Sequence, residues 1–188
     1  MDTTARDSLF LDADAFLRTD QSEFGIAWRY ELVQGRIIAH AAPSPEHGVI
    51  VGNLAGELRD RLRLRPECRL EIGSGAAPQY EQRHTARIPD AMIRCGTLPR
   101  VVFEVVSPSE LRHKRQWDQK RTDLQAVEGV LEVVEIYQDE MLAHIYRRRD
   151  AEWVFEWVAG SDAEVTLPSV GISVPLSALY ERVMPEAQ

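Results

Sequence analysis

The sequence predicts an α/β protein, because strand-like and helix-like segments alternate along its 188 residues. Apolar residues recur at helical spacing from Ile50 to Leu62, which indicates an amphipathic helix. Two short apolar runs, at 87–93 and 101–109, have the length and composition of buried strands. The chain is long enough for one domain with its own core, so we expect a single domain over residues 1–188.

Local signals indicate where the elements begin and end. A short amphipathic helix is expected at 8–20, within a helical extension over residues 1–27. Residues 30–39 form a candidate hairpin, because Gly35 can supply the positive φ of a tight turn. Ser44 is a good N-cap for the helix that follows. The later elements expected are strands at 68–72, 131–137, 142–147, 153–158 and 165–174, a helix at 111–127 that Ser109 could cap, and a short helix after Pro175.

The composition is ordinary for a globular protein, with 44% apolar and 28% charged residues. No apolar run reaches membrane-spanning length, and the N-terminus lacks a signal-peptide pattern, so we expect no membrane partner and a cytoplasmic location. Cys68 and Cys95 stand alone, without the spacing of a zinc site. We therefore expect both cysteines to be reduced, half-buried strand residues.

The net charge of −8 counts against a dedicated nucleic-acid binder, whose affinity comes mostly from basic contacts to phosphate. A nuclease is not excluded by this charge. A carboxylate-rich site contributes negative charge of its own, and bound metal neutralises part of it.

The two strand-like runs each carry one carboxylate, Asp90 and Glu104. A carboxylate in a core strand is costly unless a cation or hydrogen-bond donors pair with it. Sequential strands are usually neighbours, so both carboxylates can lie on one face of a sheet. The pair therefore suggests a shared divalent cation with oxygen ligands, and chemistry on phosphate.

Two helices supply further candidates. Lys120 lies in the middle of an apolar stripe that includes Trp117 and Leu124, and an inward lysine needs an anionic partner or a route to solvent. Glu46 and His47 occupy the first turn of the other helix, whose N-terminus favours anions. Glu46 could complete a metal shell, and His47 could contact phosphate.

Each of these residues also has a purely structural interpretation. Asp90 can end a strand by accepting hydrogen bonds from backbone N–H groups, and Glu104 can pair with Arg87. Lys120 can extend its ammonium group to solvent. Glu46 can serve only to stabilise the helix dipole, and His47 can be simply a polar residue at the helix start.

Several segments, taken in order, resemble the Uma-type family of restriction-endonuclease-like proteins, a bacterial branch of the PD-(D/E)xK nuclease superfamily. The similarity extends from about Tyr30 to Tyr180. Its motifs are Tyr-Glu-Leu-Val-Gln-Gly at 30–35, Pro-Ser-Pro-Glu-His at 43–47 with Asn53-Leu54, Ile-Pro-Asp at 88–90, Glu-Val-Val-Ser-Pro-Ser at 104–109, and Leu-Pro-Ser-Val-Gly-Ile-Ser-Val-Pro-Leu at 167–176.

The resemblance implies a restriction-endonuclease-like core, with a mixed sheet flanked by helices and an antiparallel C-terminal meander. It implies Mg²⁺ or Mn²⁺ on Asp90 and Glu104, with Glu46 as an outer ligand. The superfamily places a lysine two residues after the glutamate, where this chain has Val106. The family often supplies that lysine from the following helix, and Lys120 is the matching residue.

The function implied is metal-dependent hydrolysis of DNA phosphodiester bonds, with Asp90, Glu104, Lys120 and Glu46 as the catalytic set. Candidate substrate contacts are His47, Arg87 and Arg112. Val106 and the acidic charge motivate an alternative, a catalytically inactive nuclease-fold module that binds or regulates. A homodimer is compatible with both, because Trp153, Phe155 and Trp157 alternate on one strand face and would suit an interface.

Overall fold

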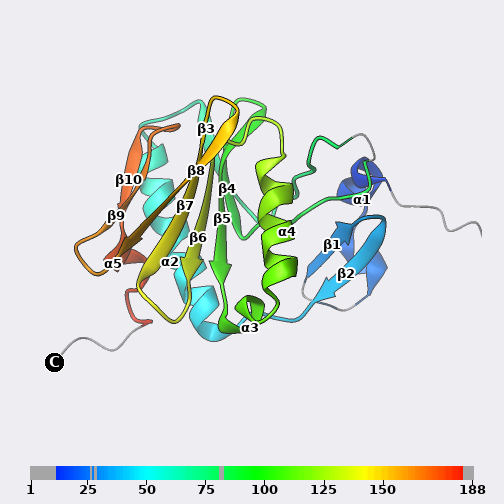
Figure 1. The fold of residues 1–188 in the computed structure, drawn as a ribbon, viewed down its shortest axis with the longest axis horizontal. Coiled ribbons are helices and arrows are strands. Elements are labelled where there is room, and N and C mark those ends of the chain that lie inside the picture. Colours follow the sequence, from blue (N-terminus) through cyan, green and yellow to red (C-terminus); the bar gives the residue numbers. More distant parts are fainter. Residues whose placement is uncertain (1–11, 26, 28, 81–82, 184–188) are drawn as a thin grey trace, which may run out of the picture.

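The structure is a computed structural model that describes residues 12–25, 27, 29–80 and 83–183. A six-stranded sheet with the order β3-β4-β5-β6-β7-β8 forms its centre (Figure 1). The strands of this sheet are β3 (Cys68–Ile72), β4 (Ala91–Cys95), β5 (Leu98–Val106), β6 (Glu132–Tyr137), β7 (Leu142–Arg149) and β8 (Glu152–Ala159). Two antiparallel pairs lie outside it, β1 (Arg29–Val33) with β2 (Arg36–His40), and β9 (Glu164–Leu167) with β10 (Ile172–Pro175).

The expected mixed sheet is confirmed. Strands β5 and β6 are parallel, and every other neighbouring pair in the six-stranded sheet is antiparallel. The parallel pair requires a crossover, which α3 (Pro108–Leu111) and α4 (Lys114–Gln125) provide. The C-terminal meander is present as β6, β7 and β8, and it continues the same sheet rather than forming a separate layer.

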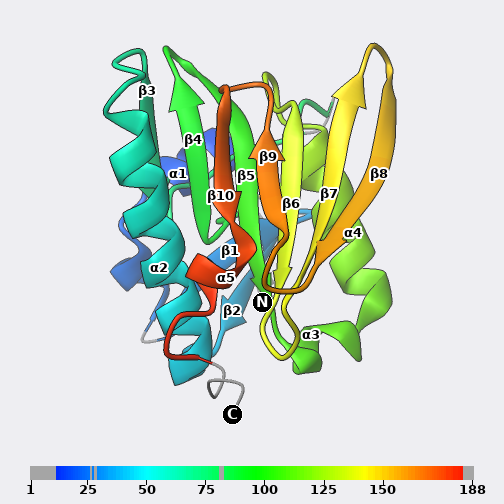
Figure 2. The same cartoon turned by 90° about the vertical axis from the view of Figure 1, so that its left-hand side faces the viewer.

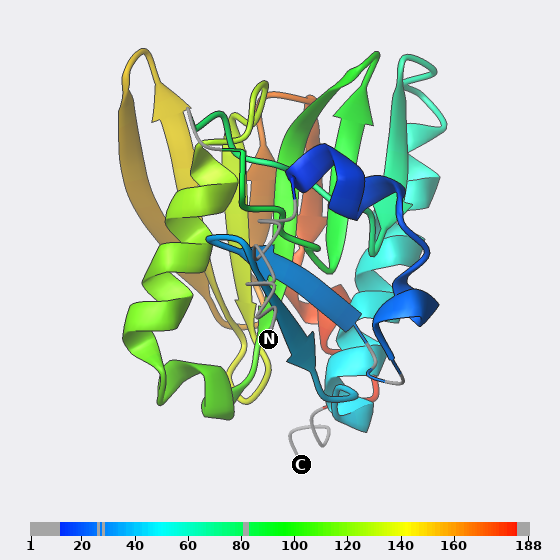
Figure 3. The same cartoon turned by 90° about the vertical axis from the view of Figure 1, so that its right-hand side faces the viewer.

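Both faces of the sheet are covered. Helix α2 (Pro45–Leu62), α5 (Leu176–Leu179) and the β9–β10 pair lie on one face (Figure 2). Helix α4, α1 (Ala13–Arg18) and the β1–β2 hairpin lie on the other (Figure 3). Because side chains alternate along β5, Phe103 and Val105 join the α2 core, whereas Val102 packs with Leu124 of α4. Glu104 therefore points toward the α4 face.

The local signals in the first half of the chain act as expected. Gln34 and Gly35 form the hairpin turn with φ of 49° and 77°, and Ser44 caps α2 by accepting from the N–H of His47. The N-terminal helix begins at Ala13, and residues 8–11 of the expected helix lie outside the described residues. A short 3₁₀ helix at Gln21–Phe24 follows it.

The helix expected at 111–127 differs in its start. It is divided into α3 and α4, with His113 at the N-terminal boundary of α4. Ser107, not Ser109, caps the first piece, because Pro108 takes the first helical position and Glu110 completes a capping box with Ser107. None of the helices in the described part of the chain is long and apolar enough to span a membrane.

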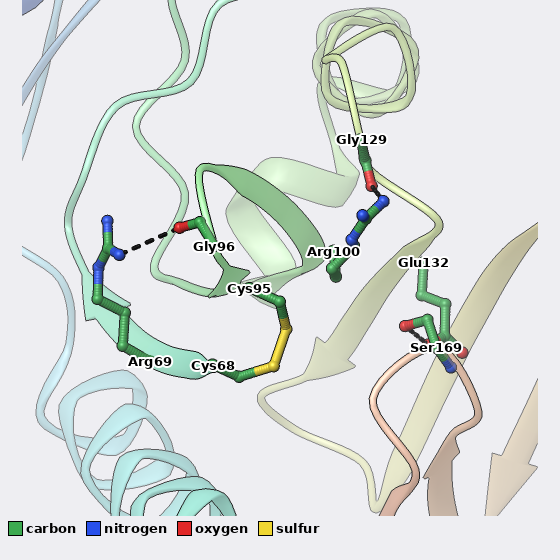
Figure 4. The surroundings of a disulfide bond; sticks show 8 residues. All are labelled: Cys68, Arg69, Cys95, Gly96, Arg100, Gly129, Glu132 and Ser169. Atoms are coloured by element: carbon green, nitrogen blue, oxygen red, sulfur yellow. Dashed lines mark hydrogen bonds between the residues drawn. A yellow bond between two sulfur atoms is a disulfide. The ribbon is translucent and has the colours of Figure 1, made fainter. Parts of the chain in front are cut away.

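The expectation of two reduced cysteines is wrong. Cys68 and Cys95 face each other directly in the antiparallel β3–β4 pair and form a disulfide (Figure 4). The sequence does not reveal this pairing, because it depends on the register of two strands separated by 27 residues. The bond ties the edge strand β3 to β4, the strand that begins directly after Asp90.

Replacing both cysteines by serine should lower the free energy of unfolding by about 3.5 kcal/mol, the value expected for closing a loop of this length. Urea unfolding of the double variant and of the wild-type protein, each with and without dithiothreitol, measures the difference. The reductant should destabilise only the wild-type protein. An equal response of both proteins to the reductant would contradict the disulfide.

Candidate active site

Five elements bring charged side chains together beneath the β1–β2 hairpin. The register of β4 and β5 pairs Ala91 with Phe103, and one residue further it brings Asp90 opposite Glu104. Both carboxylates then lie on the α4 face, as the alternation of side chains requires. Lys120 comes from α4, Arg29 and Glu31 from β1, and His47 from the first turn of α2.

Asp90 is almost fully buried, and three groups hold its carboxylate. Oδ2 accepts a hydrogen bond from the backbone N–H of Val105 at 2.8 Å. Oδ1 lies 2.8 Å from Arg29 Nη1 and 3.4 Å from His47 Nε2. Burial acts to raise the pKa of Asp90, but the contact with His47 and the charge of Arg29 outweigh it. The pKa is therefore held well below its ordinary value, and Asp90 stays ionised.

Glu104 is only 2% exposed, and its pKa shifts in the opposite direction to that of Asp90. Its Oε1 lies 2.7 Å from Lys120 Nζ, without the angles of a hydrogen bond, and has no hydrogen-bond partner among the described residues. Burial raises the pKa of Glu104 to about 8, with Lys120 acting against the shift and Asp90 adding to it. This carboxylate is thus the least compensated group of the cluster.

Lys120 points into the cluster rather than to solvent. Its Nζ lies 2.7 Å from Glu104 Oε1 and 3.4 Å from Glu31 Oε1. Burial acts to lower the pKa of Lys120, but Glu104 and then Glu31 raise it, so the ammonium group stays charged. On either side of it along α4, Trp117 Nε1 and Arg121 Nη1 donate to Glu135 of β6 at 2.9 and 3.2 Å. These bonds fix the part of the helix that carries Lys120 against the sheet.

Sequence reasoning missed Glu31, which is fully buried in β1. It accepts hydrogen bonds from Arg87 Nη1 at 3.0 Å and from the N–H of Ile88 at 3.1 Å, and it contacts Lys120. Tyr30 and Leu32 are buried as well, so this strand is enclosed on both faces. The available signal was a lone acid in an apolar hairpin strand, inside a motif already used for the family resemblance.

Three other sequence candidates do not have the surroundings that their expected roles require. Arg87 is buried and bonded to Glu31 and to Asp123 Oδ2, so it has no free guanidinium for DNA, and it does not pair with Glu104. Glu46 is exposed in the first turn of α2, where hydrogen bonds at the helix start lower its pKa. Arg112 is exposed at the end of α3. Neither of these exposed residues contacts Asp90 or Glu104 within the described residues.

A cleft of about 900 Å³ leads to this cluster between the hairpin and helices α3 and α4. Its lining includes Glu31, His40, Arg87, Trp117 and Lys120. Figure 3 shows the β1–β2 hairpin and α4 side by side in front of the sheet. The cluster therefore borders the cleft through Glu31, Arg87 and Lys120, whereas Asp90 and Glu104 are not among its lining residues.

The donor set fits a magnesium or manganese ion bound by two protein carboxylates. Magnesium keeps several waters and commonly uses one or two carboxylates together with substrate phosphates. Asp90 is ionised, and Glu104 presents a buried oxygen that lacks a hydrogen-bond partner. Within the described residues, no group of three or more acidic, histidine or cysteine side chains is arranged around one point. Two carboxylates thus form the candidate site.

A mixed sheet with two carboxylates on adjoining strands and a lysine from the crossover helix has the layout of a nuclease fold. The chain is similar to a crystal structure from Anabaena variabilis, described as a putative nuclease, with 18% identity and a TM-score of 0.70, over 93% of this chain and 99% of the other. That likeness confirms the fold. No curated protein matches. Residues 13–177 match the model of the Uma2 family, described as "Putative restriction endonuclease", and the chain belongs to this family.

Replacing Lys120 by methionine should lower the free energy of unfolding by about 3 kcal/mol or more, because two buried carboxylates lose a cation. Urea unfolding in EDTA measures this loss. Lys114→Met, at an exposed position of the same helix, is the matched control and should stay within about 0.5 kcal/mol. Glu104→Gln in the Lys120→Met background should restore part of the loss. A loss as small as that of the control would contradict the ion pairing.

Proposed function

We propose that this protein is a metal-dependent endonuclease that hydrolyses DNA phosphodiester bonds with Mg²⁺ or Mn²⁺. The observation that carries the proposal is the buried oxygen of Glu104, which lacks a hydrogen-bond partner among the described residues and lies beside Lys120. Family membership supports a nuclease function in general. The acidic net charge is compatible with it, because the carboxylates of the site account for part of that charge.

Asp90 and Glu104 are the residues that would hold the metal. When bound, the metal would polarise the scissile phosphate and lower the pKa of a coordinated water. Asp90 is prepared for this role, because the Val105 N–H fixes one of its oxygens. Glu104 would have to lose its proton first, which binding of a cation favours. Glu46, the expected outer ligand, is exposed at the start of α2, so His47 is the better placed residue of that turn.

Lys120 lies beside Glu104 and would act on the substrate rather than on the metal. Its ammonium group carries a fixed charge and has no hydrogen-bond partner within the described residues. It pairs with Glu104 and Glu31, so once a metal ion takes Glu104 it would be free to orient a water molecule or to stabilise negative charge that develops on phosphate oxygens. The superfamily's usual lysine position holds Val106, which is fully buried. The lysine from α4 would supply the missing ammonium group, which favours an active enzyme over an inactive binding module.

Titration calorimetry with Mn²⁺ tests the metal site. Asp90→Asn and Glu104→Gln should each weaken binding by more than ~100-fold, since even changes around a metal's ligands cost about 10–100-fold. Asp60→Asn, an exposed acid of α2, is the control and should bind like the wild type. Cleavage of plasmid and single-stranded DNA should require Asp90, Glu104 and Lys120. No metal binding by well-folded wild-type protein would sink the proposal, and binding without cleavage would support the inactive module.

We also propose that the protein forms a homodimer through β8, the edge strand beyond β7. Phe155 and Trp157 are 49% and 63% exposed on the α4 side of this strand. No described strand pairs with its outer edge, and an unpaired edge is a template for another chain. An antiparallel β8–β8 pair centred on Phe155 would place Trp153 opposite the second copy's Trp157. It would also place Glu156 opposite Val154.

The charges on β8 favour this register. Centring the pair on Glu156 would bring Glu156 opposite its own copy, and centring it on Val154 would bring Glu156 opposite Glu152. Like charges directly opposite each other are destabilising. The register centred on Phe155 avoids both contacts and keeps almost the whole strand paired.

Light scattering after size exclusion should give twice the chain mass of 21.4 kDa. Trp157→Lys should shift the protein to the monomer, because it places a charge in the aromatic contact. Ile72→Lys, on the opposite edge strand and 50% exposed, should leave the mass unchanged. Phe155→Cys should cross-link across the two-fold axis, whereas Val154→Cys should not. A monomeric wild-type protein contradicts the dimer.

A further inference from the structure

Arg29 lies where a cation bound to Asp90 would be expected. Its Nη1 is 2.8 Å from Asp90 Oδ1, the same oxygen that His47 approaches. The charges of Glu104, Asp90 and Glu31 all act to raise the pKa of Arg29 against its burial, so the guanidinium stays charged. A positive group on β1 thus shares the electrostatic environment of both proposed metal ligands.

The charge of the cluster decides whether Arg29 and a metal ion fit together. Two sets of ion pairs lie there, Arg29 with Asp90, and Arg87 and Lys120 with three further carboxylates, and the charges of Glu104 and Glu31 also act on Arg29. The carboxylates are Glu31, Asp90, Glu104 and Asp123, and the cations are Arg29, Arg87 and Lys120. Once Glu104 has lost its proton to bind metal, the four carboxylates exceed the three cations by one negative charge. Adding a divalent cation would leave one positive charge too many, whereas exchanging it for Arg29 would leave none. Buried charge is costly unless it is balanced, so exchange is favoured over addition.

Arg29 is also the cation that the cluster holds least firmly. Arg87 binds two carboxylates, and Lys120 contacts two, but Arg29 contacts Asp90 alone among the described residues. Its side chain is 16% exposed, against 7% for each of the other two. Its Nε is buried without a hydrogen-bond partner in the described part of the chain. An arginine held by a single bond, with an unsatisfied Nε, can leave at a low cost.

We propose that Arg29 holds the place of the divalent cation at Asp90 in the metal-free protein and leaves that carboxylate when the cation binds. The inference rests on the proposed metal-dependent function and adds a residue that regulates metal binding. Without metal, Arg29 neutralises the charge of Asp90. Because the ion must displace it, Arg29 also sets the metal concentration at which the site fills. It is a residue that tunes metal affinity and does not itself ligate the ion.

Calorimetric titration with MnCl₂ in the absence of DNA tests the exchange. Arg29→Gln should bind Mn²⁺ about 10- to 100-fold more tightly than the wild type, because the ion no longer displaces a hydrogen-bonded charge. Arg29→Lys retains the charge and should stay close to the wild type. Arg83→Gln, which removes an exposed arginine paired with Asp14, is the matched control and should not change the affinity.

A second measurement uses the wild-type chain and does not depend on the folding of a variant. Saturating Mg²⁺ should shift the Nε–H resonance of Arg29 in a nitrogen-15 NMR spectrum. The Nε–H resonance of Arg87, which is bonded to Asp123 at 2.8 Å, should move far less. An unmoved Arg29 resonance in metal-loaded protein overturns the inference.

The outcomes separate this inference from the proposed function. If the wild type binds Mn²⁺ and Arg29→Gln binds it no more tightly, the exchange is wrong and the metal site stands. If only Arg29→Gln binds the ion, Arg29 does not leave Asp90 in the wild type, and both the exchange and the metal-dependent function fail. If neither protein binds it, the metal site fails and the exchange fails with it.

Discussion

The contact between Lys120 and Glu104 is the interaction on which the rest of the site depends. It brings a buried ammonium group to 2.7 Å from a carboxylate that burial alone would keep neutral. The contact exists because β5 and β6 are parallel, so that the crossover helix α4 must lie across the strand that carries Glu104. Glu135 then fixes α4 through its bonds to Trp117 and Arg121. The topology of the sheet thus positions the charge that the chemistry requires.

Much of this arrangement could be predicted from the sequence. Asp90 and Glu104 interrupt apolar strands, and Lys120 interrupts an apolar helical stripe. Burying each charge costs free energy unless it has a partner, so the pattern itself predicts a partner. The Ser44 cap and the Gly35 turn are local signals, and the structure has both. These features follow from short-range patterns, which the order of residues records directly.

The remaining features depend on contacts between distant segments. The Cys68–Cys95 disulfide requires the β3–β4 register, and the Arg29–Asp90 bond joins residues 61 positions apart. Glu31 is visible only as a lone acid in an apolar strand, and its partners Arg87, Ile88 and Lys120 come from distant segments. Arg87 seemed free for DNA because its partner Asp123 lies on α4, 36 positions away. Sequence patterns give the face on which a side chain lies, but they do not give the partner it meets.

A crystal grown without metal and then soaked in MnCl₂ tests the central claim most directly, because the anomalous signal of manganese locates the ion independently of any activity. The account predicts one strong anomalous peak in contact with carboxylate oxygens of both Asp90 and Glu104. A well-ordered site with no peak there, or with manganese bound only elsewhere on the chain, would contradict it.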